Sequence, residues 1–412
     1  MKTIAILGGG ASGLAAAVTL ARELPDTTVL LYEKNAEPGR KLLATGNGRC
    51  NLSNQDIRPS DFHGNSALIS LLTESFGTED CLAFFRSLGL STLAEEGRIY
   101  PRTMAAATVR DVLWAEVRRL GVIVKCNTPV ETLTKTETGF LINGTEAADM
   151  VLLAVGGKAG SKFGTDGEGY KLVKALGLTY QPISPALVQM KIREDISGLH
   201  GLRVRAGITL KDHNGKEQGR EIGELQFAGD TLSGIAAMQL SGTAAVLAKT
   251  AWPTVHLDFC PEWTAADVLS FLQERRTAAD HSADKPQETG HSLCQGFLHN
   301  KLIPVLFRFC DLSAEAPASS LSDPELTRLA EAVKDFPLTV LGTKSYKDAQ
   351  VTHGGVGADQ LKPDSLECKT IPGLYFAGEL LNVDGLCGGY NLHFAWGTGI
   401  YAAKEIIRAQ NQ

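Results

Sequence analysis

The stretch Ile4-Ala5-Ile6-Leu7-Gly8-Gly9-Gly10-Ala11-Ser12-Gly13 decides the fold. Its apolar start is typical of a short buried strand, and the glycines that follow have the spacing G-x-G-x-x-G at Gly8, Gly10 and Gly13. Alanine and leucine at helical spacing continue to Leu24, and a second apolar run, Thr28–Tyr32, leads to Glu33. This order of strand, glycine turn, helix and strand predicts a nucleotide-binding βαβ unit.

Each residue of this unit has a physical role. Gly8 allows the tight turn, Gly10 lets the backbone approach a pyrophosphate, and Gly13 lets the helix pack on the strand. The helix that opens at Ala11 and Ser12 presents free N–H groups and its positive end to phosphate oxygens. Glu33 can accept hydrogen bonds from an adenosine ribose. The alternative is a glycine turn in an α/β sheet that binds no ligand.

Composition narrows the functional class. The chain has 412 residues, a net charge of −6 and 43% hydrophobic residues, which is ordinary for a globular protein of two or three domains. The negative charge disfavours non-specific binding of nucleic acid. The N-terminal segment lacks a signal-peptide pattern, and the apolar segment 232–252 is broken by polar residues, so we expect a cytoplasmic protein with a buried helix there. Eight scattered cysteines without a C-x-x-C pattern predict no metal site.

The pattern along the chain predicts an insertion into the nucleotide domain. Strand-like and helix-like stretches alternate up to about residue 187, as in α/β folds. Alternating apolar residues then predict antiparallel strands around a hairpin turn at Asn214-Gly215, and helical periodicity follows from Thr264. We therefore predict a Rossmann-like α/β domain from 1–187 and 346–412, a β insert from 188–260 and 336–345, and a helical subdomain at 261–335. Residues 278–291 are expected to form a loop.

Three further segments could complete a ligand site. Gly39–Asn51 is rich in cations and small residues and can line a pyrophosphate; the alternative is a solvated loop. Ala377-Gly378-Glu379 ends the apolar strand 374–376, where a carboxylate can contact a ribityl chain; the alternative is a helix-capping acid. Gly388-Gly389-Tyr390-Asn391-Leu392 opens the last helix, whose N-terminus would stabilise negative charge on a reduced flavin.

The sequence resembles the HI0933-like family of bacterial flavoproteins, typified by BaiN and YhiN. The motifs that carry the resemblance span nearly the whole chain: Gly8–Gly13, Gly39–Asn51, Gly223-Glu224 with Ser233-Gly234, Val351–Val356 and Gly378–Asn391. The resemblance implies one FAD, a Rossmann-like domain from both chain ends and an inserted β-barrel-like domain that carries a helical subdomain. It also implies a flavin-dependent oxidoreductase. One member type is associated with reduction of carbon–carbon double bonds in 3-oxo bile acid intermediates by NAD(P)H.

Carried over motif by motif, the resemblance also implies which residues contact FAD. They are Gly8, Gly10, Ala11, Ser12, Gly13, Glu33, Lys34, Arg40, Lys41, Thr45, Gly46, Asn47, Val130, Gly157, Gly378, Glu379, Asp384, Gly389, Asn391 and Leu392.

Candidates for proton transfer and redox chemistry are fewer. His353 lies in a glycine-flanked turn and could titrate near neutrality; a structural histidine is the alternative. Tyr390 and Tyr100 could donate a hydrogen bond to a substrate carbonyl, or pack in the core or against the flavin. Cys50 could have a redox role or be a packed small residue. No second G-x-G-x-x-G follows a strand, so NADH or NADPH would approach the flavin in a shared pocket.

These observations predict an FAD-dependent oxidoreductase acting on a small unsaturated or carbonyl compound, with NADH or NADPH as electron donor. One alternative is a tRNA-modifying flavoprotein, which would need a basic patch, for example Arg193, Arg203 and Arg205. The other is a non-catalytic flavin-binding sensor. The choice of donor, the substrate and the oligomeric state stay open at this point.

Overall fold

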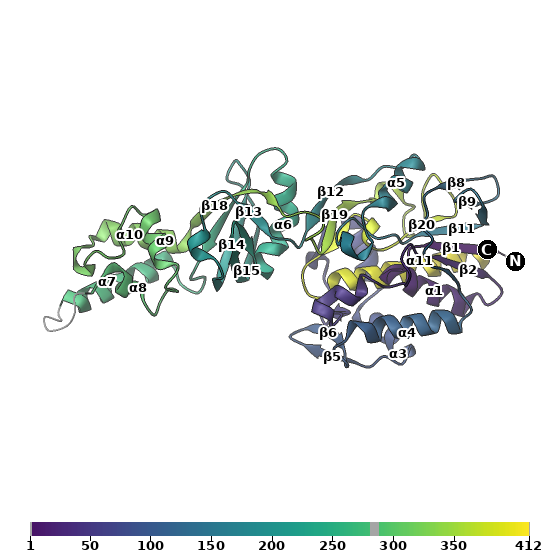
Figure 1. Ribbon diagram of the computed structural model, residues 1–412, viewed down its shortest axis with the longest axis horizontal. Helices are drawn as coiled ribbons and strands as arrows, with labels where there is room; N and C mark the ends of the chain where they lie inside the picture. Colours follow the sequence, from purple (N-terminus) through teal and green to yellow (C-terminus); the bar gives the residue numbers. More distant parts are fainter. Residues whose placement is uncertain (1, 281–287, 412) are drawn as a thin grey trace. The chain divides into compact units, whose positions relative to one another are not determined.

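The computed structural model describes residues 2–280 and 288–411, and these fold into two compact units. Unit 1 comprises Met1–Pro185 and Tyr346–Gln412, and unit 2 comprises Ala186–Ser345. Both chain ends therefore belong to the same unit, as Figure 1 shows by its purple and yellow ribbons. The three-part division by residue ranges made above stays a prediction.

A five-stranded parallel sheet forms the centre of unit 1. Its strand order is β20-β11-β1-β2-β7, so the first strand lies in the middle with the C-terminal strand at one edge. The central strands are almost continuous apolar runs because helices and loops cover both faces of a parallel sheet. The strands are β1 (Thr3–Leu7), β2 (Thr28–Tyr32), β7 (Ile123–Lys125), β11 (Met150–Leu153) and β20 (Leu374–Phe376).

Two helices from opposite ends of the chain cross beside this sheet. Helix α1 (Ala11–Glu23) packs against α11 (Tyr390–Asn411). A Cβ added to Gly399 would lie 2.3 Å from the carbonyl oxygen of Ser12. Glycine at 399 therefore lets the C-terminal helix lie directly against the start of α1.

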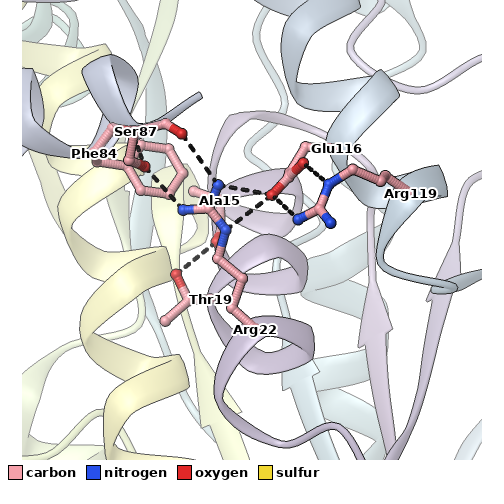
Figure 2. A network of polar contacts seen from close by, with 7 residues as sticks. All are labelled: Ala15, Thr19, Arg22, Phe84, Ser87, Glu116 and Arg119. Carbon is pink, nitrogen blue, oxygen red and sulfur yellow. Dashed lines mark hydrogen bonds and ion pairs between the residues drawn. The ribbon is translucent and has the colours of Figure 1, made fainter. Parts of the chain in front are cut away.

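A polar network fixes the other end of α1. Figure 2 shows the guanidinium of Arg22 between α3 (Thr78–Ser87) and α4 (Ala106–Arg119). Arg22 Nη1 donates to Ser87 Oγ at 2.8 Å, and Arg22 Nη2 donates to Glu116 Oε1 at 2.7 Å. Arg119 Nε donates to the other carboxylate oxygen of Glu116 at 2.6 Å. The network ties three helices together at the C-terminal end of α1.

Short elements complete unit 1. A meander of three antiparallel strands separates β7 from β11 in the chain, and β12 pairs with β19. These elements are β3 (Ser53–Asn54), β4 (Phe62–Gly64), α2 (Ser66–Ser75), β5 (Thr92–Glu95), β6 (Arg98–Pro101), β8 (Leu133–Lys135), β9 (Phe140–Ile142), β10 (Glu146–Ala148), α5 (Glu168–Ala175), β12 (Gln181–Ala186), β19 (Val351–Gly355) and β21 (Val383–Gly385).

Unit 2 contains a closed six-stranded barrel with the order β13-β16-β15-β14-β17-β18. The hairpin predicted at Asn214-Gly215 is confirmed: β14 pairs antiparallel with β15, and Gly215 has the positive φ of 80° that this turn requires. The apolar side chains that alternate along the strands fill the interior. The strands are β13 (Met190–Ile192), β14 (Arg203–Lys211), β15 (Glu217–Ala228), β16 (Thr231–Ser233), β17 (Thr254–Asp258) and β18 (Phe336–Thr343).

Helices make up the rest of unit 2. The segment expected to hold a buried helix contains α6 (Ile235–Leu247), and Thr264 caps α7 (Ala265–Asp280) together with Asp267, as the sequence predicts. The other helices are α8 (Gly290–Cys294), α9 (Ile303–Phe309) and α10 (Asp323–Lys334). The loop predicted at 278–291 is shorter at both ends, and its centre, 281–287, lies outside the described residues.

The predicted fold class is confirmed: a Rossmann-like α/β unit from both chain ends, an antiparallel barrel and a helical region. Among residues 2–280 and 288–411, no helix combines the length and the apolar character needed to cross a membrane.

Candidate functional site

The glycines of the glycine-rich turn in unit 1 differ in how much space surrounds them. A Cβ at Gly8, where φ is 109°, would lie 2.4 Å from the oxygen of Ala154, and a Cβ at Gly13 would lie 1.9 Å from the oxygen of Gly8. At Gly10 an added Cβ would meet nothing within 4 Å. Gly8 and Gly13 are therefore required by the protein's own backbone, whereas Gly10 leaves open space directly before α1.

The start of α1 is suited to an anion. Gly10 caps the helix without a side-chain hydrogen bond, and the first turn contains no acidic residue. No side-chain cap and no first-turn acid therefore offsets the positive end of the helix at the amides of Ala11 and Ser12. Open space, an uncapped helix N-terminus and the absence of nearby acid in that turn fit a pyrophosphate.

Glu33, the predicted ribose acid, is buried and held in one orientation. Its Oε2 accepts from the Gly9 amide at 3.1 Å, and its Oε1 accepts from the Asn35 amide at 2.8 Å and from Asn35 Nδ2 at 2.7 Å. Thr128 N donates to the Glu33 backbone oxygen, which brings the segment that contains half-buried Val130 alongside. An acceptor position remains on Oε2, as a ribose hydroxyl needs.

Two of the predicted cationic contacts face other protein groups. Lys34 Nζ lies 2.8 Å from Glu168 Oε2 and 3.2 Å from Asp166 Oδ1. Burial lowers the pKa of Lys34, but these two carboxylates outweigh it and the pKa is raised. Arg40 is exposed and reaches Asn35 Oδ1 at 3.4 Å. These contacts of both cations are therefore with other side chains and do not orient either of them toward the open space before α1.

Lys41 and Glu379 meet although 338 positions separate them. Lys41 Nζ donates to Glu379 Oε2 at 2.6 Å, and Thr352 donates to Glu379 Oε1 through both its amide, at 2.9 Å, and its hydroxyl, at 2.8 Å. The structure thus brings together two residues that the resemblance assigned to the cofactor. It also adds Thr352, which sequence reasoning missed because a threonine within Val351–Val356 has no distinguishing local pattern.

The glycines around Glu379 are required by packing. A Cβ on Gly157 would lie 2.4 Å from Thr352 Oγ1 and 2.5 Å from Glu379 Oε1, so this predicted cofactor contact is glycine because of its protein neighbours. Gly378 has φ of 73°, and its Cβ would lie 2.5 Å from Ser12 Oγ. Gly378 therefore places the Glu379 turn directly over the start of α1.

The loop 39–51 approaches the start of α11. Thr45, Gly46 and Asn47 leave helical geometry, with positive φ at Gly46 and Asn47. Gly389, with φ of 100°, lies so close that its Cβ would be 2.3 Å from Ser53 O and 2.7 Å from Asn51 Oδ1. Among the described residues, Asn51 Oδ1 is buried without a hydrogen-bond partner. This is the kind of orphaned acceptor that a ligand N–H or O–H would satisfy.

Asn391 and Leu392 continue this wall at the first turn of α11. The Asn391 side chain is engaged within the chain: Oδ1 accepts from the Gly385 amide at 2.8 Å, and Nδ2 donates to the Gly385 oxygen at 2.7 Å. Leu392 is half-buried. Asn391 therefore stiffens the turn 385–391 through its side chain.

His353 and Asp384 form a pair on neighbouring strands. His353 Nδ1 lies 2.7 Å from Asp384 Oδ1, where the His353 side chain is 22% exposed and that of Asp384 only 5%. Asp384 is therefore an orienting partner of His353. Opposite Asp384 in the β4–β21 pair stands His63, whose Nε2 is buried without a hydrogen-bond partner in the described part of the chain.

The remaining candidates have clear packing roles. Cys50 is fully buried, and burial raises the pKa of its thiol to about 12, so a redox-active thiolate is disfavoured and the packed-residue alternative is favoured. Tyr390 is half-buried, its ring makes a T-shaped contact with Phe62, and burial raises its pKa. Tyr100 is buried beneath the guanidinium of Arg49, 4.9 Å from its ring centre.

Comparison with known proteins places this geometry in a family. The family model described as the HI0933-like protein Rossmann domain matches residues 2–405. The chain belongs to the HI0933-like family. The predicted family is thereby confirmed, and the chain is an FAD-dependent oxidoreductase, as the sequence predicts.

Two curated proteins that are similar to this HI0933-like chain are named for different reactions. A 3-dehydro-bile acid delta(4,6)-reductase of Clostridium scindens is 38% identical over 414 residues, with 98% of each chain covered. A ribosomal RNA dihydrouridine synthase of Escherichia coli is 28% identical, again over 98% of each chain.

Solved structures resemble the chain more distantly. A 3-ketosteroid delta1-dehydrogenase from Sterolibacterium denitrificans is 11% identical, with a TM-score of 0.48 and coverage of 99% of this chain and 100% of the other. A flavocytochrome c3 fumarate reductase is 14% identical, with a TM-score of 0.47, covering 99% of this chain and 78% of the other.

Proposed function

We propose that this protein reduces a carbon–carbon double bond conjugated to a carbonyl group in a small steroid-like molecule, using NADH or NADPH through FAD. The main support is the similarity to the bile acid delta(4,6)-reductase, at 38% identity along nearly the whole of both chains. A 3-oxo steroid with double bonds at positions 4 and 6 contains this conjugated system.

The proposed contacts to FAD come from the unit that both chain ends build. The open space at Gly10 and the uncapped start of α1 would take the pyrophosphate, and Glu33 would accept from the adenosine ribose. Glu379 and the turn at Gly389 would hold the flavin half. When bound and reduced, FAD supplies a hydride; the protein binds, orients and excludes water.

The protein would also supply the proton. Reduction of a conjugated double bond places a hydride on the β carbon and a proton on the α carbon. His353 is our candidate for the donor, because its Nδ1 lies 2.7 Å from Asp384 Oδ1, which orients the ring, and its side chain is 22% exposed. Solvent can return a proton to the ring through its exposed part.

Rapid-mixing spectroscopy tests this assignment. Under anaerobic conditions, NADH or NADPH should bleach the oxidised flavin bands, and a 3-oxo-4,6-diene steroid should restore them as one of its two double bonds is reduced. In His353→Gln, bleaching by the donor should stay within about twofold, while restoration by the steroid should slow by roughly 10²- to 10⁴-fold. Restoration at the wild-type rate would remove His353 from the mechanism.

The same experiment addresses the two alternatives. Uridine in RNA also carries a double bond conjugated to a carbonyl, and relatives at 28% and 25% identity are named ribosomal RNA dihydrouridine synthases. In unit 2, however, Arg193 stacks on Trp252 at 4.1 Å and Arg205 pairs with Glu262, and acidic residues outnumber basic ones. Reoxidation by ribosomal RNA alone would favour the RNA alternative, and a flavin that no donor bleaches would favour a sensor.

A further inference from the structure

Thr352 is the centre of a hydrogen-bonded junction in unit 1. It is fully buried on β19, and every hydrogen-bonding position of its hydroxyl is used. The hydroxyl donates to Glu379 Oε1 at 2.8 Å and accepts from the amides of Lys158 at 2.8 Å and Ala159 at 3.0 Å. One side chain thus joins the segment after β11, strand β19 and the turn that carries Glu379.

The junction leaves Glu379 a single free acceptor position. An ionised carboxylate has about four such positions, two on each oxygen. Oε1 accepts both the amide and the hydroxyl of Thr352, and Oε2 accepts from Lys41 at 2.6 Å. Gly157 fills the space beside Oε1, because a Cβ added to Gly157 would lie only 2.5 Å from Glu379 Oε1. The open position is therefore on Oε2, beside the ammonium of Lys41.

We propose that Thr352 is a positioning residue that orients the Glu379 carboxylate, so that Oε2 alone accepts a hydroxyl hydrogen bond from FAD. This inference rests on the FAD-dependent function proposed above and deepens it. The Lys41 ammonium beside Oε2 forms an ion pair with the carboxylate and suits a cofactor segment that carries hydroxyls next to a phosphate. Without the Thr352 hydroxyl, Oε1 loses one of two donors and the carboxylate can rotate.

Equilibrium binding of FAD to deflavinated protein tests the proposal, with flavin fluorescence as readout. Thr352→Val should weaken FAD binding about tenfold, Thr352→Ser should restore it to within about twofold, and Glu379→Gln should weaken it about tenfold or more. The double variant Thr352→Val/Glu379→Gln should bind FAD like Glu379→Gln alone, because Thr352 acts through Glu379.

A matched control separates positioning from general loss of structure. Thr19 is also a buried threonine, but its hydroxyl donates only to Ala15 O in its own helix, so Thr19→Val should leave FAD affinity unchanged (Figure 2). Additive losses in the double variant, failure of serine to rescue, or unchanged affinity of Thr352→Val would overturn the positioning role. Wild-type protein that does not bind FAD would overturn this role and the proposed function together. Normal FAD results without steroid reduction would overturn the proposed function alone.

Discussion

Protonation of one buried histidine should destabilise the protein well above the pH at which carboxylates titrate. His393 lies in the first turns of α11 with no exposed surface. Its Nε2 donates to the Phe76 oxygen at 3.1 Å, so Nδ1 is the acceptor for the Ser53 hydroxyl at 2.9 Å and the ring is neutral. Burial lowers the pKa of His393 to about 4, against an ordinary 6.5, and the bond to Phe76 offsets this only in part.

The sign follows from proton linkage. The folded-state pKa lies below the unfolded one, so the unfolded state binds more protons between pH 6.5 and 4. The contribution of the neutral ring to the free energy of unfolding is complete above pH 6.5 and is lost as the pH falls towards 4. At about 1.4 kcal/mol per pKa unit the whole loss is about 3 kcal/mol, of which about 2 kcal/mol falls between pH 7 and pH 5.

Denaturant unfolding of the FAD-saturated protein measures this loss. His393→Gln can keep both hydrogen bonds but cannot titrate, so its free energy of unfolding should fall by about 2 kcal/mol less than that of wild type between pH 7 and pH 5. His213→Gln, at an exposed turn, is the control and should follow wild type. Parallel profiles for wild type and His393→Gln would refute the reasoning.

Three further outcomes are expected. Iodoacetamide at pH 8 should label half-exposed Cys387 in the native protein and spare Cys50 until unfolding, as peptide mass spectrometry can check; early labelling of Cys50 would contradict its burial. Gly10→Ala should keep the melting temperature of FAD-free wild type but lose bound flavin, whereas Gly13→Ala should fail to fold stably because its Cβ collides with backbone. Glu116, whose pKa Arg119 and Arg22 lower to about 2 against the opposing effect of burial, should contribute about 1 kcal/mol after solvent screening, present above pH 4.5 and lost as the pH falls towards 2. Urea unfolding of Glu116→Gln should therefore be less pH-dependent than that of wild type below pH 4.5, and equal slopes would argue against the shift.

The sequence predicts those parts of the fold that short-range patterns determine. The glycine spacing after an apolar strand specifies a turn in which the backbone requires glycine at Gly8 and Gly13, and the strand and helix periods around it are local. The hairpin at Asn214-Gly215 is predictable for the same reason. The approach of Gly13 to Gly8 and the pairing of β14 with β15 both join residues that lie close together in the chain.

The site is less predictable because its contacts join distant residues. Lys41, Thr352 and Glu379 meet only after the sheet has brought β20 beside β11, and no periodicity in any one segment reports this. The pairing of His353 with Asp384 likewise depends on two short strands meeting side by side. Burial also decides chemistry that residue type leaves open, as for Cys50, whose thiol could be reactive in an exposed loop.

The crossing of α1 and α11 has a consequence for biosynthesis. All six barrel strands lie within one continuous stretch, β13 to β18, so a nascent chain can close the barrel while later residues are still being translated. The α1 face that packs on α11, and the Gly378 turn above Ser12, must wait for the last helix to leave the ribosome. The proposed nucleotide site is therefore completed only after α11 has emerged, and nascent chains arrested before α11 should contain a folded barrel but not yet retain FAD.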